Sequence, residues 1–169
     1  MLFRSGSAIR TTELTFGTDS DLDGVPDPGS TGSGGHVTIQ GITGSAADFV
    51  VLSGGSQIKS ESLGSGDGGR LSIAATFLNL DGASTLNSRT DGIGHGGDIV
   101  VSVQKASFSG EATIVSHSAA LGAGGTITVQ GLDGNGSKAD TLTLAGFLSR
   151  ILSESEGSGL PGDIEVHAL

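Results

Sequence analysis

The residues with the clearest chemical potential are four aspartates in the segment TDSDLDGVPDPG, residues 18–29. Asp19, Asp21 and Asp23 stand at alternate positions, a glycine follows them, and Asp27 comes after a further two residues. If Asp19 opens a loop, its carboxylates fall where calcium loops place oxygen ligands, and Val25 offers a backbone carbonyl between them. The glycine permits the sharp turn that wraps such a loop around the ion. We therefore predict a structural Ca²⁺ site formed by Asp19, Asp21, Asp23, Val25 and Asp27.

In these positions the segment resembles the calcium loops of thrombospondin type-3 repeats and of EF-hands. The resemblance stops there, because Ser30 stands where an EF-hand has a bidentate glutamate, and no flanking helices are apparent. Without that glutamate we expect weak affinity, on the order of millimolar, as in extracellular calcium modules. The alternative interpretation is a hydrated acidic loop that binds no metal.

A second set of polar and ionisable residues recurs at one position of a repeated segment: Thr12, Glu61, Arg89, His117 and Glu154. If these segments stack as strands, the side chains form a row on the surface. Carboxylates and a base in such a row can serve acid–base cleavage of a polysaccharide. The simpler interpretation is a cross-strand charge ladder, in which each pair contributes less than about 1 kcal/mol. The absence of Trp and Tyr leaves few aromatic platforms for sugar stacking, which favours the ladder.

Glycine motifs are abundant, and GIGHGG at residues 92–97 satisfies the G-x-G-x-x-G spacing of dinucleotide-binding turns. That function requires a strand before the motif and a helix opening within it. Here a β-branched run, DIVVSV, follows the motif instead, and a second match, GSGDGG, lies upstream at 64–69. We interpret both matches as corners of a repeat. The four histidines (36, 95, 117 and 167) show no metal-ligand spacing, and neither a nucleophile elbow nor a P-loop occurs.

The elements that would position these residues follow from a repeat anchored on the second residue of each GG or PG pair. The anchors are Gly35, Gly69, Gly97, Gly125 and Gly162. Each is followed by an alternating run: HVTIQ, RLSIA, DIVVS, TITVQ or DIEVH. Alternation with a period of two indicates a half-buried strand. A second strand such as TFLNL and a third strand with an apolar residue two positions before a hydroxyl complete each repeat.

Three short strands in about 28 residues cannot bury a face alone, but stacked copies can. We therefore predict an all-β fold, a right-handed parallel β-helix (solenoid) of about five to six coils of ~28 residues. Residues 1–169 form a single solenoid segment, with an acidic loop insertion at about 13–30 and smaller insertions at about 42–48 and 131–140. Leu80 and Ile99 should face inward, and the third strands should contribute an inward stack of hydroxyls. We expect the corner glycines to supply positive φ angles and close packing.

Composition narrows the classes of function. The net charge is −10 and the eight basic residues are scattered singly, which argues against nucleic acid as a partner. No apolar run approaches the ~20 residues of a membrane span. The absence of cysteine excludes disulfides and thiolate metal sites. Unpaired strand edges at the two terminal coils favour end-to-end self-association.

The pattern GxGGxIxV … LxLxGxSxIxS resembles the repeats of filamentous-haemagglutinin-type exoproteins of bacterial two-partner secretion, over nearly the whole chain. The resemblance implies a parallel β-helix, a secreted or cell-surface location, and a non-enzymatic structural or adhesive role. The implied partner is a receptor or glycan on a host or neighbouring cell. We expect a segment of a longer solenoid, whose export signal is not in this chain. The rival hypothesis is a β-helical polysaccharide-active enzyme, or a carbohydrate-binding module, that uses the surface row or the longer loops.

Overall fold

The protein is all-β with parallel sheets, which confirms the predicted class at that level. The computed structural model describes residues 2–3, 8–13, 32–134 and 136–169. No α-helix occurs in these ranges, and no helix there is long and apolar enough to span a membrane. The elements in chain order are β1 (Leu2–Phe3), β2 (Ala8–Glu13), β3 (Val37–Ile39), η1 (Ile42–Gly44), β4 (Ala47–Leu52), β5 (Gln57–Ser62), β6 (Leu71–Leu80), β7 (Thr85–Thr90), β8 (Ile99–Phe108), β9 (Thr113–Ser118), β10 (Ile127–Gln130), β11 (Thr141–Leu144), β12 (Arg150–Ser155) and β13 (Ile164–Val166).

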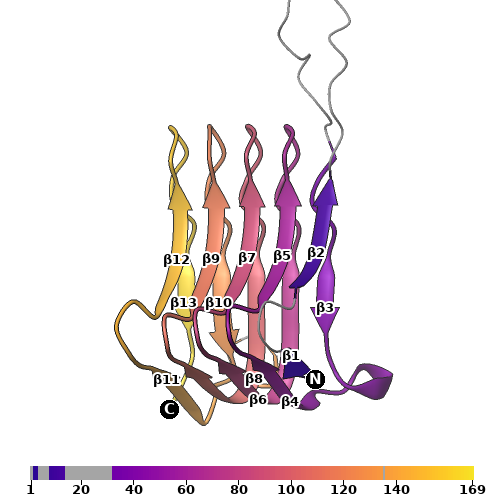
Figure 1. Ribbon diagram of the computed structural model, residues 1–169, viewed down its shortest axis with the longest axis vertical. Coiled ribbons are helices and arrows are strands. Elements are labelled where there is room, and N and C mark those ends of the chain that lie inside the picture. Colours follow the sequence, from indigo (N-terminus) through magenta and orange to yellow (C-terminus); the bar gives the residue numbers. More distant parts are fainter. Residues whose placement is uncertain (1, 4–7, 14–31, 135) are drawn as a thin grey trace, which may run out of the picture.

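The strands form two parallel sheets whose order follows the sequence repeat. The first sheet runs β1-β4-β6-β8-β10-β13, with β3 also paired to β6 and β11 to β8. The second sheet runs β12-β9-β7-β5-β2. In Figure 1 these five strands lie side by side, and the colour moves steadily from indigo to yellow across them. Each strand therefore pairs with the equivalent strand of the next repeat unit.

The pairing register has the same interval as the sequence repeat. Leu71 pairs with Ile99 in the first sheet and Thr85 with Thr113 in the second, and both intervals equal the one between the anchors Gly69 and Gly97. The interval changes on either side of residues 40–46, because Val37 pairs with Leu71 but Ala47 pairs with Ala75. It changes again between β10 and β11. Extra residues at these two places leave the strands on either side aligned with their neighbours.

The expected first and second strands are continuous in the two central units, where β6 and β8 are each ten residues long. The division into three separate strands is therefore wrong for these units. The two predicted faces are nevertheless distinct. Inward and outward residues alternate up to Ala75, then the outward Thr76 and Phe77 come in succession, and the buried Leu78 and Leu80 restart the alternation. The strand bends at this change of phase. Its two halves therefore face the core from different directions, although no extra residues separate them.

One hydrophobic core joins the two sheets. It includes inward residues of the first sheet, such as Leu80 and Ile99, and of the second sheet, such as Leu86 and Ile114. Leu80 and Ile99 are both fully buried, which confirms the predicted strand phases. Most core side chains are Val, Ile, Leu or Ala, so the core is thin and each layer is supplied by one repeat unit.

Glycine-rich connectors, defined as residues 63–70, 91–98, 119–126 and 156–163, lead from each second-sheet strand to the next first-sheet strand. Their backbone is held by hydroxyls that point inward from the second sheet. Ser116 Oγ donates to Gly97 O and accepts from Gly125 N, both at 2.9 Å, and thereby joins two successive connectors. Ser118 Oγ donates to Gly94 O at 2.9 Å. The predicted inward hydroxyl stack is confirmed for Ser60, Ser88 and Ser116, each with no exposed surface.

The glycines of the GG corners serve packing and not positive φ, so that part of the expectation is wrong. Described glycines with positive φ include Gly55, Gly82 and Gly110, which lie in the turns after the first-sheet strands. In the connectors, a Cβ on Gly97 would collide with the carbonyl oxygens of Gly68 and Gly69 in the preceding unit. Glycine is required there because neighbouring backbones approach too closely for any side chain.

Candidate functional site

The predicted calcium ligands Asp19, Asp21, Asp23, Val25 and Asp27 lie outside the residues that the structure describes. The same is true of the predicted acidic insertion at about 13–30, apart from Glu13 at the end of β2. Elsewhere, within the described ranges, no three His, Asp or Glu side chains gather so that they could hold a metal ion. Calcium binding therefore stays a prediction.

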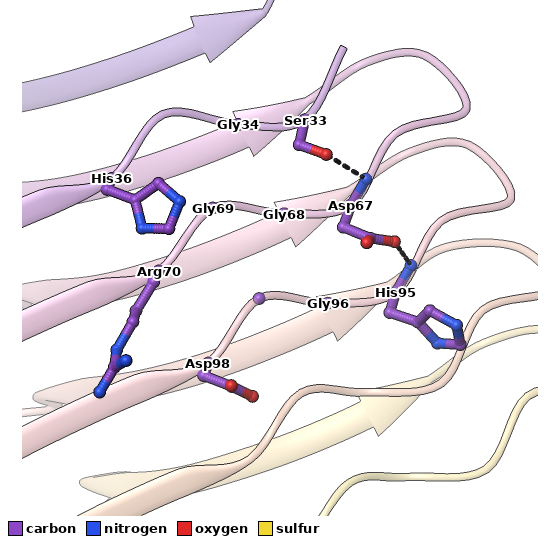
Figure 2. Close-up of a pocket in the computed structure, with 11 residues that line it drawn as sticks. Ser33, Gly34, His36, Asp67, Gly68, Gly69, Arg70, His95, Gly96 and Asp98 are labelled. Carbon is purple, nitrogen blue, oxygen red and sulfur yellow. Dashed lines mark hydrogen bonds between the residues drawn. The ribbon is translucent and has the colours of Figure 1, made fainter. Parts of the chain in front are cut away.

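The structure instead presents a groove of about 480 Å³ along the glycine-rich connectors. Its floor is made by glycine pairs of successive units, including Gly68, Gly69, Gly96 and Gly97. Because these residues lack side chains, the surface is hollowed between two rows of polar residues. Figure 2 shows His36, Arg70 and Asp98 along one side of the floor and Ser33, Asp67 and His95 along the other.

The row of Ser33, Asp67 and His95 forms a hydrogen-bonded ladder, in which each side chain accepts the backbone N–H of the equivalent residue in the next unit. Ser33 Oγ accepts from Asp67 N at 3.2 Å, and Asp67 Oδ1 accepts from His95 N at 2.7 Å. His95 Nδ1 accepts from Ala123 N at 2.9 Å, which places the proton of the neutral ring on Nε2. These side chains therefore hold the units in register along one edge of the groove.

The opposite row supplies charge. Asp98 Oδ1 accepts from Thr126 N at 2.8 Å, as in the first row. Arg70 and His36 are exposed, and within the described residues neither makes an ion pair. The groove thus offers a guanidinium, imidazole N–H groups and carboxylate oxygens on a backbone floor. It contains hydrogen-bonding groups for a polar ligand, but no hydroxyl that is hydrogen-bonded to a histidine among the residues described.

His36 and His95 both line this groove, although their spacing in the sequence did not predict a shared site. A signal was present, because Ser33, Asp67 and His95 each stand two residues before an anchor glycine and His36, Arg70 and Asp98 each stand one residue after an anchor. Alignment of the repeats on their anchors would have brought out both rows. The predicted sites lay in the third strands, in the acidic segment and, for the rival hypothesis, in the longer loops.

The predicted surface row lies on the second sheet, whose register pairs Thr12, Glu61, Arg89, His117 and Glu154 in succession. The expected ladder of ion pairs between neighbours in this row is wrong. Glu61 pairs with Lys59 of its own strand at 3.3 Å, and Arg89 pairs with Asp91, two residues along the chain. The register therefore brings the members of this row side by side, but their charges pair with residues outside the row.

Among Glu61, Arg89, His117 and Glu154, His117 is the most buried, with 8% of its side chain exposed. Its Nε2 lies 3.2 Å from Glu156 Oε1, and its Nδ1 is buried without a hydrogen-bond partner. A shallow groove of about 220 Å³ next to it is also lined by Arg150 and Glu154. The arrangement is a carboxylate–histidine pair in a mixed-charge groove.

Comparison with known proteins assigns no relative: no family model, no curated protein and no solved structure matches the chain.

Proposed function

We propose that the chain is a right-handed parallel β-helix that serves as a non-enzymatic structural or adhesive segment of a secreted or cell-surface bacterial exoprotein. The observation that carries the proposal is that each kind of segment bonds to its equivalent in the next unit. The strands do so in both sheets, the connectors through pairs such as Gly68 N to His95 O at 2.8 Å, and the turns through Gly55 N to Gly82 O at 2.6 Å. Such bonding on every side is the pattern of a solenoid, and strand twist favours the right-handed path.

A solenoid of this kind supports a structural role because its stability comes from neighbouring units and it displays long, regular surfaces. The glycine-floored groove supports an adhesive role, since it runs across several units and exposes Arg70 and His36 beside carboxylates. A groove of this form fits an extended polar ligand, such as a glycan chain or a receptor loop on a host or neighbouring cell. The resemblance to filamentous-haemagglutinin-type repeats points to the same role.

Adhesion is tested with beads that carry the purified chain, added to cultured epithelial cells and to bacterial lawns. We expect beads with the wild-type chain to be retained and beads with His36→Ala plus Arg70→Ala to be retained several-fold less. Lys138→Ala, an exposed change outside the groove, is the matched control. Equal retention of wild-type and uncoated beads would reject the adhesive role and leave only the structural one.

We also propose that Ca²⁺ stabilises the acidic segment through Asp19, Asp21, Asp23, Val25 and Asp27. Four carboxylates crowded into one short segment repel one another, and a divalent cation would neutralise that charge. Calorimetric titration at millimolar calcium should give heat of binding and a rise in melting temperature that follows mass action. Asp21→Ala combined with Asp23→Ala should abolish both. Absence of both signals in the wild type would leave a hydrated acidic loop.

The rival function, a polysaccharide-active enzyme or carbohydrate-binding module, rests on the carboxylate–histidine pair of His117 and Glu156 beside Arg150 and Glu154. The chain is incubated with acidic and neutral polysaccharides, and new reducing ends and unsaturated products are measured. We expect neither, because the His117 side chain is only 8% exposed, its Nε2 is paired with Glu156, and the chain has no Trp or Tyr on which a sugar could stack. Product release by the wild type that is lost in Glu154→Gln would favour the enzyme.

A further inference from the structure

A column of three residues stands out on the outward face of the first sheet, where most exposed side chains are small and polar. The register pairs Phe49 of β4 with Phe77 of β6, and Phe77 with Lys105 of β8. A groove of about 330 Å³ follows this column and is bounded on its other side by Val51, Asn79, Ser107 and Thr143.

The aromatic rings are ordered yet exposed. The rings of Phe49 and Phe77 are stacked with centroids 5.1 Å apart and planes within 11° of each other. Lys105 Nζ lies 5.7 Å from the centre of the Phe77 ring, a cation–π contact. Phe49 is 57% exposed and Phe77 38% exposed, although both are large apolar side chains. An exposed apolar column next to an ammonium group marks an interaction surface.

The charged side chains around this column make no ion pairs within the described part of the chain. Lys105 makes no ion pair there, in a protein whose net charge is −10. Asp48, directly before Phe49 and exposed, makes none there either. Lys105 and Asp48 stand two strands apart, about 9–10 Å at the spacing of neighbouring strands, and they make no ion pair with each other.

We propose that this face binds a second copy of the same chain, as a dimer with a two-fold axis that lies in the interface along β6. Rotation about that axis reverses the order of the strands in the second copy relative to the first. Because the axis is parallel to β6, each residue of the second copy keeps the same height along the strand direction. Phe77 then meets Phe77 of the other copy, and Lys105 meets Phe49 and the neighbouring Asp48. The pairs of Lys105 with Asp48 occur twice because the contact is isologous.

The rest of the face is compatible with the same axis. Asn79 meets its own equivalent, and a side-chain amide is both donor and acceptor, so two such groups can bond each other. Val51 meets Ser107 without burying an unpaired charge. A peptide that adds a strand is disfavoured as the occupant, because β6 and β8 are hydrogen-bonded on both sides and offer no free edge here. The patch is small, which implies a weak, concentration-dependent dimer.

Sedimentation velocity over a wide range of concentration tests the dimer on the full chain. We expect the wild type to shift reversibly from one to two chains as its concentration rises, before the slower end-to-end growth of the terminal units contributes. Phe77→Ser should abolish the shift, and Lys105→Asp or Asp48→Lys should weaken dimerisation about tenfold, the loss expected for ~1.4 kcal/mol. Lys138→Asp, a lysine on an exposed loop outside the face, should have no effect. Circular dichroism of each variant verifies that the β-structure is retained.

The decisive variant carries Asp48→Lys and Lys105→Asp together, because the exchange restores both pairs in the proposed dimer. Recovery of the wild-type dimerisation constant supports the proposal even if each single variant associates weakly for another reason. A monomer at all concentrations overturns it. So does association that continues past two chains and ignores every change at Asp48, Phe77 and Lys105, which is the behaviour of end-to-end stacking. None of these outcomes depends on the adhesive role, which the bead assay measures separately.

Discussion

At the scale of single residues, the inward serines of the second sheet replace the side-chain packing that the glycine-rich connectors cannot provide. Ser116 is fully buried, and its hydroxyl satisfies a carbonyl in one connector and an N–H in the next. Ser116→Ala should lower the free energy of unfolding by about 2–4 kcal/mol, because two buried backbone groups lose their partner. Ser107→Ala, on the outer face of the first sheet, should change it by less than about 0.5 kcal/mol. Chemical denaturation measures both, and equal values would contradict the stapling role.

The two classes of glycine should respond differently to alanine. Gly97→Ala places a methyl group against backbone oxygens of the neighbouring unit, which cannot move without breaking the register. We expect a loss of about 3 kcal/mol, the upper range for overpacking. Gly55→Ala meets open space, and its cost is that of a φ of +76°, about 1 kcal/mol. Melting temperatures of the two variants compare these costs, and a larger loss at Gly55 would show that packing at the connector is loose.

At the scale of elements, the phase of each strand decides which side chains reach the core. Leu80 is fully buried in β6, and its neighbour Asn79 points outward. Leu80→Asp buries an unpaired charge and should cost about 3–5 kcal/mol. Asn79→Asp adds the same charge one residue away and should cost less than about 1 kcal/mol. Urea titration separates the two variants. Similar stability of both would mean that the strand is shifted by one residue, which exchanges the faces.

The strand phases were predictable because alternation is a local property of the sequence, as in ITV of β10 and LNL at the end of β6. The continuity of β6 and β8 was not predictable from the sequence. The change of phase at Thr76 and Phe77 gives the same sequence pattern whether one continuous strand bends there or two separate strands meet. The role of the connector glycines was also beyond local reasoning. A Cβ at position 97 would collide with the carbonyl of Gly68 only because two units approach each other closely. That distance between units cannot be read from any short segment of the sequence.

The candidate site is a product of stacking and was predictable only in part. The register that groups Glu61, Arg89 and His117 follows from the interval of the sequence repeat. Their actual partners, Lys59, Asp91 and Glu156, depend on side-chain reach, which the interval does not determine. To predict the groove between His36 and His95, one would also have had to place two rows of polar residues on either side of a glycine floor.

At the scale of the whole molecule, the last repeat unit differs from those inside the stack. Ile164 and Val166 are 45% and 47% exposed, whereas Ile127 and Val129 at the same positions of the preceding unit are fully buried. For the isolated chain we predict slow end-to-end growth in addition to any lateral dimer. Ile164→Lys together with Val166→Lys should suppress that growth, as measured by light scattering over time. Unchanged scattering would place the growing contact elsewhere.

The central claim is that the chain is a stack of units in which each strand pairs with its equivalent in the next unit. Disulfide formation can test it, since the wild type contains no cysteine. The register places Thr85 directly between Gln57 and Thr113. Neighbouring strands lie about 4.8 Å apart, within reach of a disulfide, and strands two units apart lie near ~9.6 Å, beyond reach. On mild oxidation, Thr85→Cys with Thr113→Cys should cross-link within one chain, and Gln57→Cys with Thr113→Cys should not. No bond in the first variant, or equal bonding in both, would contradict the stack.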